Sequence, residues 1–115
     1  MRVGEMQQCL SLQAAAGARG LDRKVAAGYC GDLLSDVMAN AQKGSVWITI
    51  QSHQNIVAVA VLRELAAVVL ANGRAPDEET RAKADAEGIP ILLSPLSSYV
   101  LAGKLYGLGI GRIEE

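Results

Sequence analysis

The apolar segment between Ser45 and Gly73 places the strongest constraint on how this chain can fold. Its first part, Ser45–Gln51, reads SVWITIQ and is rich in β-branched and aromatic residues, which predicts a strand. Its second part, Ile56–Leu70, is apolar on every face, and Arg63-Glu64 interrupt it too early for a bilayer span. We therefore expect a strand, a turn, a helix and a second strand at the centre of the core.

Periodicity alone leaves Ile56–Leu62 open between helix and strand, because apolar residues occupy both faces. Two observations favour a helix. The segment reaches the next apolar run, Ala66–Leu70, without the Gly, Pro or Asn-Gly turn that a hairpin needs. A helix also continues the alternation of strands and helices seen on either side. The valines lower helix propensity, but burial overrides that cost.

The remaining segments extend this alternation over a single domain, residues 1–115. The further strands that we expect are Leu12–Ala16, Val25–Cys30 and Ile89–Leu93. The further helices are Met1–Leu10, one opened by Asp32 as N-cap and closed by Gly44, one that starts at Pro76 and ends at Gly88, and Tyr99–Leu108 capped by Ser97 or Ser98. This order predicts an α/β fold, a mainly parallel sheet covered by helices in two or three layers.

Composition limits the classes of function. Half of the 115 residues are hydrophobic, there is no Phe, and Trp47 is the only Trp, so the core is aliphatic. A net charge of −1 argues against binding to nucleic acid. Cys9 and Cys30 lack metal or redox spacing, and we expect buried thiols in a reducing cytoplasm. Glu5 and Gln7 interrupt any signal-peptide core, so we expect a cytoplasmic protein that does not contact membranes.

Polar residues follow each expected parallel strand, where ligands bind in open parallel sheets. The residues that we expect to gather there are Gly31, Asp32, Ser52, His53, Gln54, Asn55, Asn72, Gly73 and Ser94, with Ser97 beside them. Ser52 can cap the next helix, whose free N–H groups would face an anion. His53 could donate to a phosphate or change charge near neutral pH. The alternative is that His53 forms a local hydrogen bond in the turn or a contact across a dimer interface.

Signatures of catalysis are missing from the sequence. It contains no Walker phosphate loop and no G-x-S-x-G nucleophile elbow. One His among scattered acids gives no metal cluster, and we expect no cofactor. A small enzyme that uses His53 as general base is the weaker alternative, because no orienting partner is visible nearby in the sequence. Tyr29, Tyr99 and Tyr106 are interpreted as core or interface residues.

Four segments together resemble a stand-alone DRTGG domain: GDLLSDVMANA, WITIQSHQNIVAVAVL, AAVVLANGRAPDEE and EGIPILLSPLSSYVLAGKLYGLGI. Such domains are similar to the N-terminal domain of HPr kinase/phosphorylase, and they occur in phosphate acetyltransferases and in CBS-containing pyrophosphatases. The resemblance implies a regulatory or assembly-forming module, often dimeric. Ser52-His53 stand where the family motif begins with Asp-Arg, and Asn72-Gly73 stand where it has Gly-Gly, so only Gly73 carries over.

Two hypotheses follow for the function. The first is a non-catalytic regulatory or ligand-sensing domain that forms a homodimer through an aliphatic helix face and holds a small anionic metabolite beside Ser52 and His53. The high apolar share of a short chain supports a partner surface. The second is a protein–protein adaptor for a larger metabolic or redox enzyme, with no small-molecule ligand.

Overall fold

Five strands form one sheet in the computed structural model, which describes residues 1–111. The strands are β1 (Gln13–Ala16), β2 (Ala27–Cys30), β3 (Ser45–Thr49), β4 (Ala67–Leu70) and β5 (Ile91–Leu93). Their order across the sheet is β1-β5-β4-β3-β2. The four strands β2 to β5 are parallel, and β1 pairs antiparallel with β5 at one edge. The expected mainly parallel sheet is thus confirmed.

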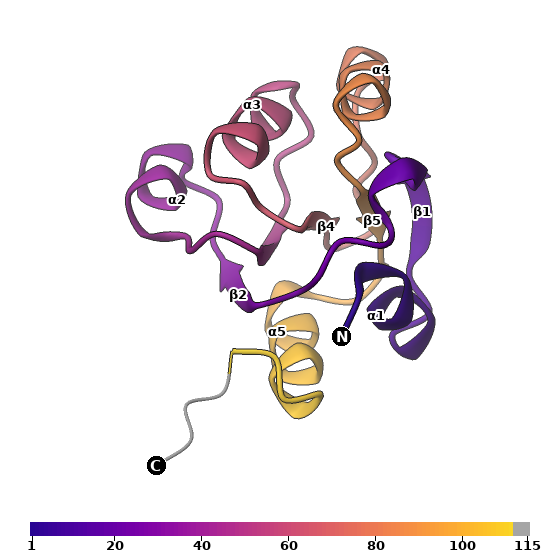
Figure 1. Cartoon of the computed structure of the whole chain (residues 1–115), viewed down its shortest axis with the longest axis vertical. Helices are drawn as coiled ribbons and strands as arrows, with labels where there is room; N and C mark the ends of the chain where they lie inside the picture. Colours follow the sequence, from indigo (N-terminus) through magenta and orange to yellow (C-terminus); the bar gives the residue numbers. More distant parts are fainter. Residues whose placement is uncertain (112–115) are drawn as a thin grey trace.

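Helices cover both faces of this sheet, so the molecule has three layers (Figure 1). One face carries α2 (Leu34–Asn40), α3 (Asn55–Leu62) and α4 (Glu78–Glu87), and the other carries α1 (Val3–Cys9) and α5 (Ser98–Gly107). The segment that periodicity left open is therefore a helix, α3, and the strand–helix–strand order of the central stretch is confirmed.

Side chains of the central strands point alternately into two aliphatic cores, one on each face of the sheet. Trp47 and Val68 pack under α2, α3 and α4, whereas Val46 and Val69 pack under α1 and α5. All four side chains are buried. Because both faces are covered, β3 and β4 have no polar side to show in the sequence, which explains their uninterrupted apolar runs.

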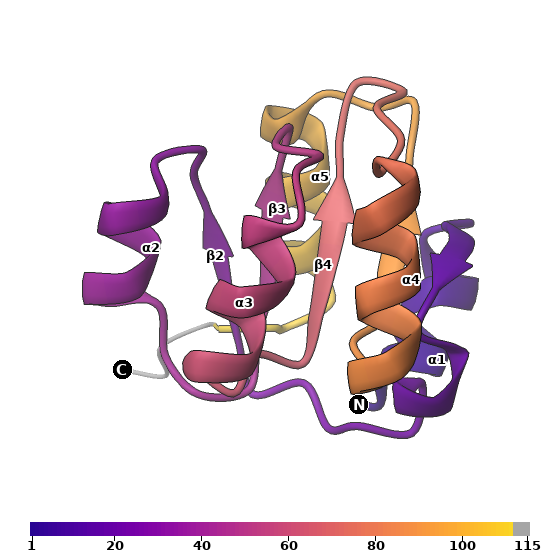
Figure 2. The same ribbon diagram turned by 90° about the horizontal axis from the view of Figure 1, so that it is seen from above.

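The parallel strands follow one another across the sheet in chain order, and their connecting helices all lie on one face. Such an order has no point at which the direction of winding reverses, the place where open α/β sheets form a ligand crevice. The chain instead crosses the molecule once, between β1 at one edge and β2 at the other (Figure 2). We call residues 17–26 the crossing segment.

Two glycines let the crossing segment pack closely against the loop after α4. Gly17 has a φ of +72°, and a Cβ there would lie 1.9 Å from the Ile89 carbonyl oxygen. A Cβ on Gly20 would lie 2.2 Å from the Gly88 carbonyl oxygen. Asp85 adds a hydrogen bond, because its carboxylate accepts from the Gly17 N–H at 2.7 Å. Larger residues at either glycine would push the crossing segment off the molecule.

Several expected helix ends are wrong. Helix α2 begins at Leu34 with no side-chain cap, so Asp32 does not act as its N-cap. The same helix ends at Asn40, and Gly44, although left-handed at φ +79°, lies in the turn before β3. The N-cap residue of α4 is Asp77, so Pro76 precedes the helix. By contrast, Gly88 ends α4 in the left-handed conformation and Ser97 caps α5, as expected.

The expectation of buried thiols is also wrong, because Cys9 and Cys30 are both exposed. Each lies at the end of a short element, where the chain leaves the cores on its way to a loop. Among residues 1–111, no helix is long and apolar enough to cross a membrane.

Candidate ligand-binding site

The carboxyl ends of the parallel strands lie together at one end of the sheet, shown at the top of Figure 2. We call this the carboxyl end, and the opposite one the amino end. The loops after β2, β3, β4 and β5 all lie there, so the sequence predicted the right end of the sheet for its candidate residues. The structure then separates these residues into three groups with different hydrogen-bond partners.

The first group, Gly31 and Asp32, joins β2 to the end of β3. One carboxylate oxygen of Asp32 accepts from the Thr49 hydroxyl at 2.9 Å and from the Ile50 N–H at 3.0 Å. The Gln51 amide donates to the Asp32 carbonyl at 2.9 Å. Gly31 offers its carbonyl oxygen to the indole N–H of the buried Trp47 at 2.8 Å. These groups stabilise the sheet, because each satisfies a donor that the end of β3 would otherwise leave open.

Cys30 precedes this group. The residue as a whole is exposed, yet partial desolvation of its sulfur raises the pKa of the thiol, and the nearby Asp32 carboxylate raises that pKa further. A raised pKa leaves less thiolate at neutral pH, so the environment of Cys30 is the opposite of that of a reactive cysteine.

The second group is the turn Ser52–Asn55 before α3. The Ser52 carbonyl accepts from the Asp77 N–H at 3.1 Å and from the Thr80 hydroxyl at 2.7 Å, which ties the turn to the start of α4. Gln54, without a side-chain cap, is the N-cap residue of α3, so the expectation that Ser52 caps this helix is wrong.

His53 forms a local hydrogen bond within this turn. The residue is exposed, and its Nδ1 accepts from the Asn55 N–H at 3.3 Å. Gln54 donates its side-chain amide to Glu79 at 3.4 Å. The acceptor role of Nδ1 matches the local alternative for His53, and it occupies one backbone donor that a bound anion would need.

The third group consists of Asn72, Gly73 and Ser94 in the loops after β4 and β5. The two loops are joined by backbone hydrogen bonds, from Asn72 N–H to Leu96 carbonyl at 2.9 Å and from Gly73 N–H to Ser94 carbonyl at 3.0 Å. Asn72 and Gly73 both have positive φ, 58° and 69°, which makes the turn sharp. Apart from Gly73 itself and its two chain neighbours, no heavy atom lies within 4 Å of the position of a Cβ on Gly73, so the space beside this turn is open.

A cavity of about 290 Å³ opens at this third group, and we call it the carboxyl-end cavity. Its lining residues are Ser11, Gln13, Gly73, Arg74, Leu93, Ser94 and Pro95. Ser94 is 3% exposed, and its hydroxyl oxygen accepts from the Leu96 N–H at 3.1 Å. Within residues 1–111 the Ser94 O–H has no acceptor, and the exposed Arg74 side chain has no hydrogen-bond or ion-pair partner. Arg74 is therefore available to an anion at the cavity, and the Ser94 hydroxyl keeps an unused donor in a residue that lines it.

Sequence reasoning missed Arg74, Ser11 and Gln13. Arg74 directly follows the Asn72-Gly73 turn, so the signal was present in the sequence as an arginine beside an expected site. Ser11 and Gln13 lie before and in β1, whose antiparallel pairing with β5 brings them to this loop. No local pattern predicts that pairing.

The side chains at the carboxyl end include donors but no cluster of metal ligands among the described residues. The described residues, 1–111, contain no group of three or more His, Cys, Asp and Glu side chains that could hold a metal ion. Arg74, the Ser94 hydroxyl and polar side chains from β1 provide donors for an anionic or polar ligand.

Comparison with known proteins supports the fold. No family model matches the chain, and no curated protein shows significant similarity to it. A solved structure that resembles it is the crystal structure of the CBS and DRTGG domains of the regulatory region of Clostridium perfringens pyrophosphatase, complexed with the activator diadenosine tetraphosphate. The TM-score is 0.66 at 14% sequence identity, over 89% of this chain and 44% of that chain. The chain has a DRTGG-like fold.

This chain therefore spans less than half the length of the pyrophosphatase region that it resembles. In its DRTGG-like fold, the two positions compared with the family motif separate in space. Ser52-His53 lead into α3, whereas Gly73 lies in the next loop and is bound to Ser94. Only Gly73 borders the carboxyl-end cavity.

Proposed function

We propose that the protein is a non-catalytic regulatory domain that senses a small phosphate-bearing anion in the carboxyl-end cavity. The observation that carries this proposal is the arrangement of Gly73, Arg74 and Ser94 around that cavity. The similar regulatory region of the pyrophosphatase supports the same class, because it is described in complex with a phosphate-bearing activator.

Each of these three residues supports one part of anion recognition. Arg74 supplies a planar guanidinium that can donate two parallel hydrogen bonds to a phosphate. Ser94 supplies a buried O–H without an acceptor in residues 1–111. Gly73, whose N–H already binds the Ser94 carbonyl, contributes open space beside the turn rather than a donor. A volume of about 290 Å³ suits a phosphate group or a small phosphate ester, with any larger part of a ligand extending into solvent.

A thermal-shift assay with inorganic phosphate, acetyl phosphate, ATP and diadenosine tetraphosphate tests this proposal. A ligand that binds only the folded chain raises the melting temperature with its concentration. We expect stabilisation by at least one of the four compounds, and loss of that stabilisation in the variant Arg74→Gln.

Arg81→Gln is the matched control, since Arg81 is an exposed arginine on α4 that lies outside the lining of the carboxyl-end cavity. This variant should keep the full stabilisation. Failure of all four compounds to stabilise the wild-type chain would contradict the proposal, and so would equal loss in both variants.

We further propose that the regulatory domain forms a homodimer through an exposed face of α5. Tyr99 and Tyr106 are seven residues apart on this helix, which places them on one face, and they are 89% and 57% exposed. This proposed face carries two tyrosines, whereas an aliphatic helix face was expected from the sequence. Light scattering at micromolar concentration should give the mass of a dimer, and Tyr99→Ser should shift the mass toward a monomer. A wild-type monomer would contradict this part of the proposal.

The second candidate function is a protein–protein adaptor without a small-molecule ligand. It is favoured by a second apolar surface in the other helical layer, where Leu62 at the end of α3 is 69% exposed and Val61 is 40% exposed. An α5 dimer would leave these side chains uncovered. The adaptor predicts no stabilisation by phosphate compounds, the reverse of the result expected for the sensing domain.

A further inference from the structure

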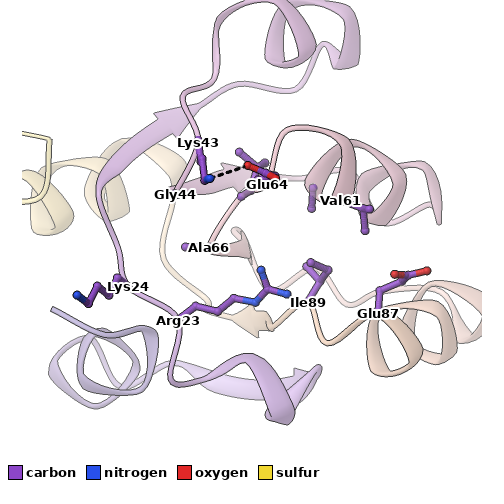
Figure 3. Close-up of a pocket in the computed structure, with 11 residues that line it drawn as sticks. Arg23, Lys24, Lys43, Gly44, Val61, Glu64, Ala66, Glu87 and Ile89 are labelled. Carbon is purple, nitrogen blue, oxygen red and sulfur yellow. Dashed lines mark ion pairs between the residues drawn. The ribbon is translucent and has the colours of Figure 1, made fainter.

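A second cavity, of about 450 Å³, lies at the amino end of the sheet (Figure 3), and we call it the amino-end cavity. Four parts of the chain enclose it: the crossing segment, the turn before β3, the end of α3 with its connection to β4, and the loop after α4. Its lining residues are Arg23, Lys24, Lys43, Gly44, Ala60, Val61, Glu64, Leu65, Ala66, Glu87 and Ile89. The cavity shares no residue with the carboxyl-end cavity.

The lining combines an apolar floor with charged side chains. Leu65, Ala66 and Ile89 on the floor are all buried. Lys43 and Glu64 form an ion pair at one side of the cavity, with 3.0 Å between Nζ and Oε2, so their charges offset each other. The charges of Arg23, Lys24 and Glu87 then leave a net charge of +1 around the cavity.

Arg23 differs from the other arginines at this end of the molecule. Arg19 donates to the Ala86 carbonyl at 2.7 Å, and Arg63 donates to the Ala41 carbonyl at 2.7 Å, so each binds the open end of a helix. Arg23 is half-buried as a residue, and its guanidinium has no hydrogen-bond or ion-pair partner among residues 1–111. It extends over the middle of the cavity, toward Ile89 (Figure 3).

The position of Arg23 is fixed by its backbone rather than by its side chain. The Arg23 carbonyl accepts from the Val3 N–H at 2.9 Å, and its N–H donates to the Gly20 carbonyl at 3.1 Å. The anchored backbone holds the base of the side chain beside the cavity, and the planar guanidinium can bind a planar acceptor such as a carboxylate through two parallel hydrogen bonds.

The surroundings select a singly charged ligand. The C-terminal ends of α3 and α4 border the cavity, and helix C-termini carry partial negative charge. Together with the Glu87 carboxylate, they disfavour a polyanion such as a nucleotide triphosphate. The apolar floor favours a ligand with a hydrocarbon part. A carboxylate that carries a short aliphatic chain has both properties.

We propose that the amino-end cavity binds a small aliphatic monocarboxylate. The carboxylate pairs with the Arg23 guanidinium, and the hydrocarbon chain lies over Val61, Leu65 and Ile89. This site rests on different residues from the proposed phosphate site, so either can fail without the other.

Isothermal titration calorimetry with isocaproate tests the proposal, with isocaproamide and inorganic phosphate as comparison compounds. We expect saturable binding of isocaproate and no measurable binding of the uncharged amide. Loss of the charge-assisted pair in Arg23→Gln should weaken the affinity by about tenfold or more. Arg81→Gln should leave it unchanged, since Arg81 is exposed on α4 and does not line the cavity.

A second variant, Val61→Asp, adds a negative charge at an exposed position of the cavity lining and leaves the Arg23 guanidinium in place. Val61 is 40% exposed, so the variant should fold, and the new carboxylate should repel isocaproate. The melting temperature of each variant without ligand reports whether it is folded. The proposal is overturned if isocaproate fails to bind the wild-type chain, or if folded Arg23→Gln binds isocaproate equally well. It is also overturned if Arg23 proves to bind phosphate instead: the wild-type chain would then release heat with phosphate but not with isocaproate, and Arg23→Gln would lose the phosphate signal.

Discussion

The two ends of the parallel sheet differ in which polar groups are used in contacts between loops and in where a cavity remains. At the carboxyl end, most polar groups are used in joining one loop to the next: Asp32 binds the end of β3, and the Ser52 carbonyl binds the start of α4. The group around Gly73 and Ser94 instead borders a cavity. At the amino end, the crossing segment bridges the strands, and a cavity with an apolar floor remains beneath Arg23.

This difference shows that the two ends favour different ligands. The loops of the carboxyl end lead into helix N-termini, whose partial positive charge favours anions with high charge. The amino end faces helix C-termini, so an anion there depends on arginine and lysine side chains and on apolar contact. This contrast is the reason why we propose a phosphate-type site at one end of the sheet and a carboxylate-type site at the other.

The largest expected effect concerns the core of the sheet, which supports the loops at both ends. Trp47 is fully buried, and its indole N–H binds the Gly31 carbonyl at 2.8 Å. Trp47→Ala should lower the free energy of unfolding by about 3–5 kcal/mol, because it removes a large core side chain. Urea denaturation measures this change. Leu62→Ala, at an exposed apolar position, is the control and should change the free energy of unfolding little. Equal losses in the two variants would contradict the position of Trp47 in the core.

The next effect sharpens the account of the carboxyl end. Asp32→Ala leaves the buried Thr49 hydroxyl and the Ile50 N–H without their shared acceptor, which should cost about 1–3 kcal/mol of stability. Urea denaturation at neutral pH checks the value. Asp22→Ala is the matched control in the crossing segment, where the exposed carboxylate has no partner among residues 1–111, and it should be near neutral. If Asp32→Ala behaved like this control, Asp32 would be free to serve a ligand.

A smaller effect tests how α5 starts beside the carboxyl-end cavity. The Ser97 hydroxyl accepts from the Val100 N–H at 3.2 Å, so Ser97→Ala should cost about 1 kcal/mol, as expected for loss of an N-cap. Ser98 is the first residue of the helix, and Ser98→Ala should cost less. Thermal denaturation of the two variants decides between the two caps that the sequence allowed, and the reverse ranking would move the helix start by one residue.

The smallest effect concerns the ion pair at the amino end. Lys43 and Glu64 are 79% and 62% exposed, and exposed pairs are screened by solvent. A double-mutant cycle with Lys43→Gln and Glu64→Gln should give a coupling energy below about 1 kcal/mol, which falls further as salt rises. A larger, salt-independent coupling would show that the pair closes the amino-end cavity rather than merely bordering it.

The order of elements could be predicted because different sequence signals in the same segment point to the same structure. Ile56–Leu62 is apolar on all faces and reaches the next strand without a Gly, Pro or Asn-Gly turn, and the missing hairpin turn favours a buried helix between two strands. The roles of Gly88 and Ser97 were also predictable, because each acts within one helical turn. Gly88 adopts the left-handed conformation that ends α4, and the Ser97 hydroxyl accepts from a free N–H at the start of α5.

Roles that depend on distant contacts could not be predicted. Asp32 has the sequence context of an N-cap, but the end of β3 offers its carboxylate two donors, and that tertiary contact prevails. The carboxyl end was predictable as a place, since every loop after a parallel strand must lie there. Which loops enclose a cavity depends on the antiparallel β1, whose alanine-rich sequence gives little indication of its partner.

Amide chemical-shift mapping by NMR, in a titration with inorganic phosphate, tests the central claim that the phosphate site lies at Gly73, Arg74 and Ser94. The account predicts saturable shifts concentrated at these three residues, with the amides of Gly44 and Ala66 at the amino end unchanged. Shifts confined to Ser52–Asn55 or to the amino end, or the absence of any saturable shift, would contradict it.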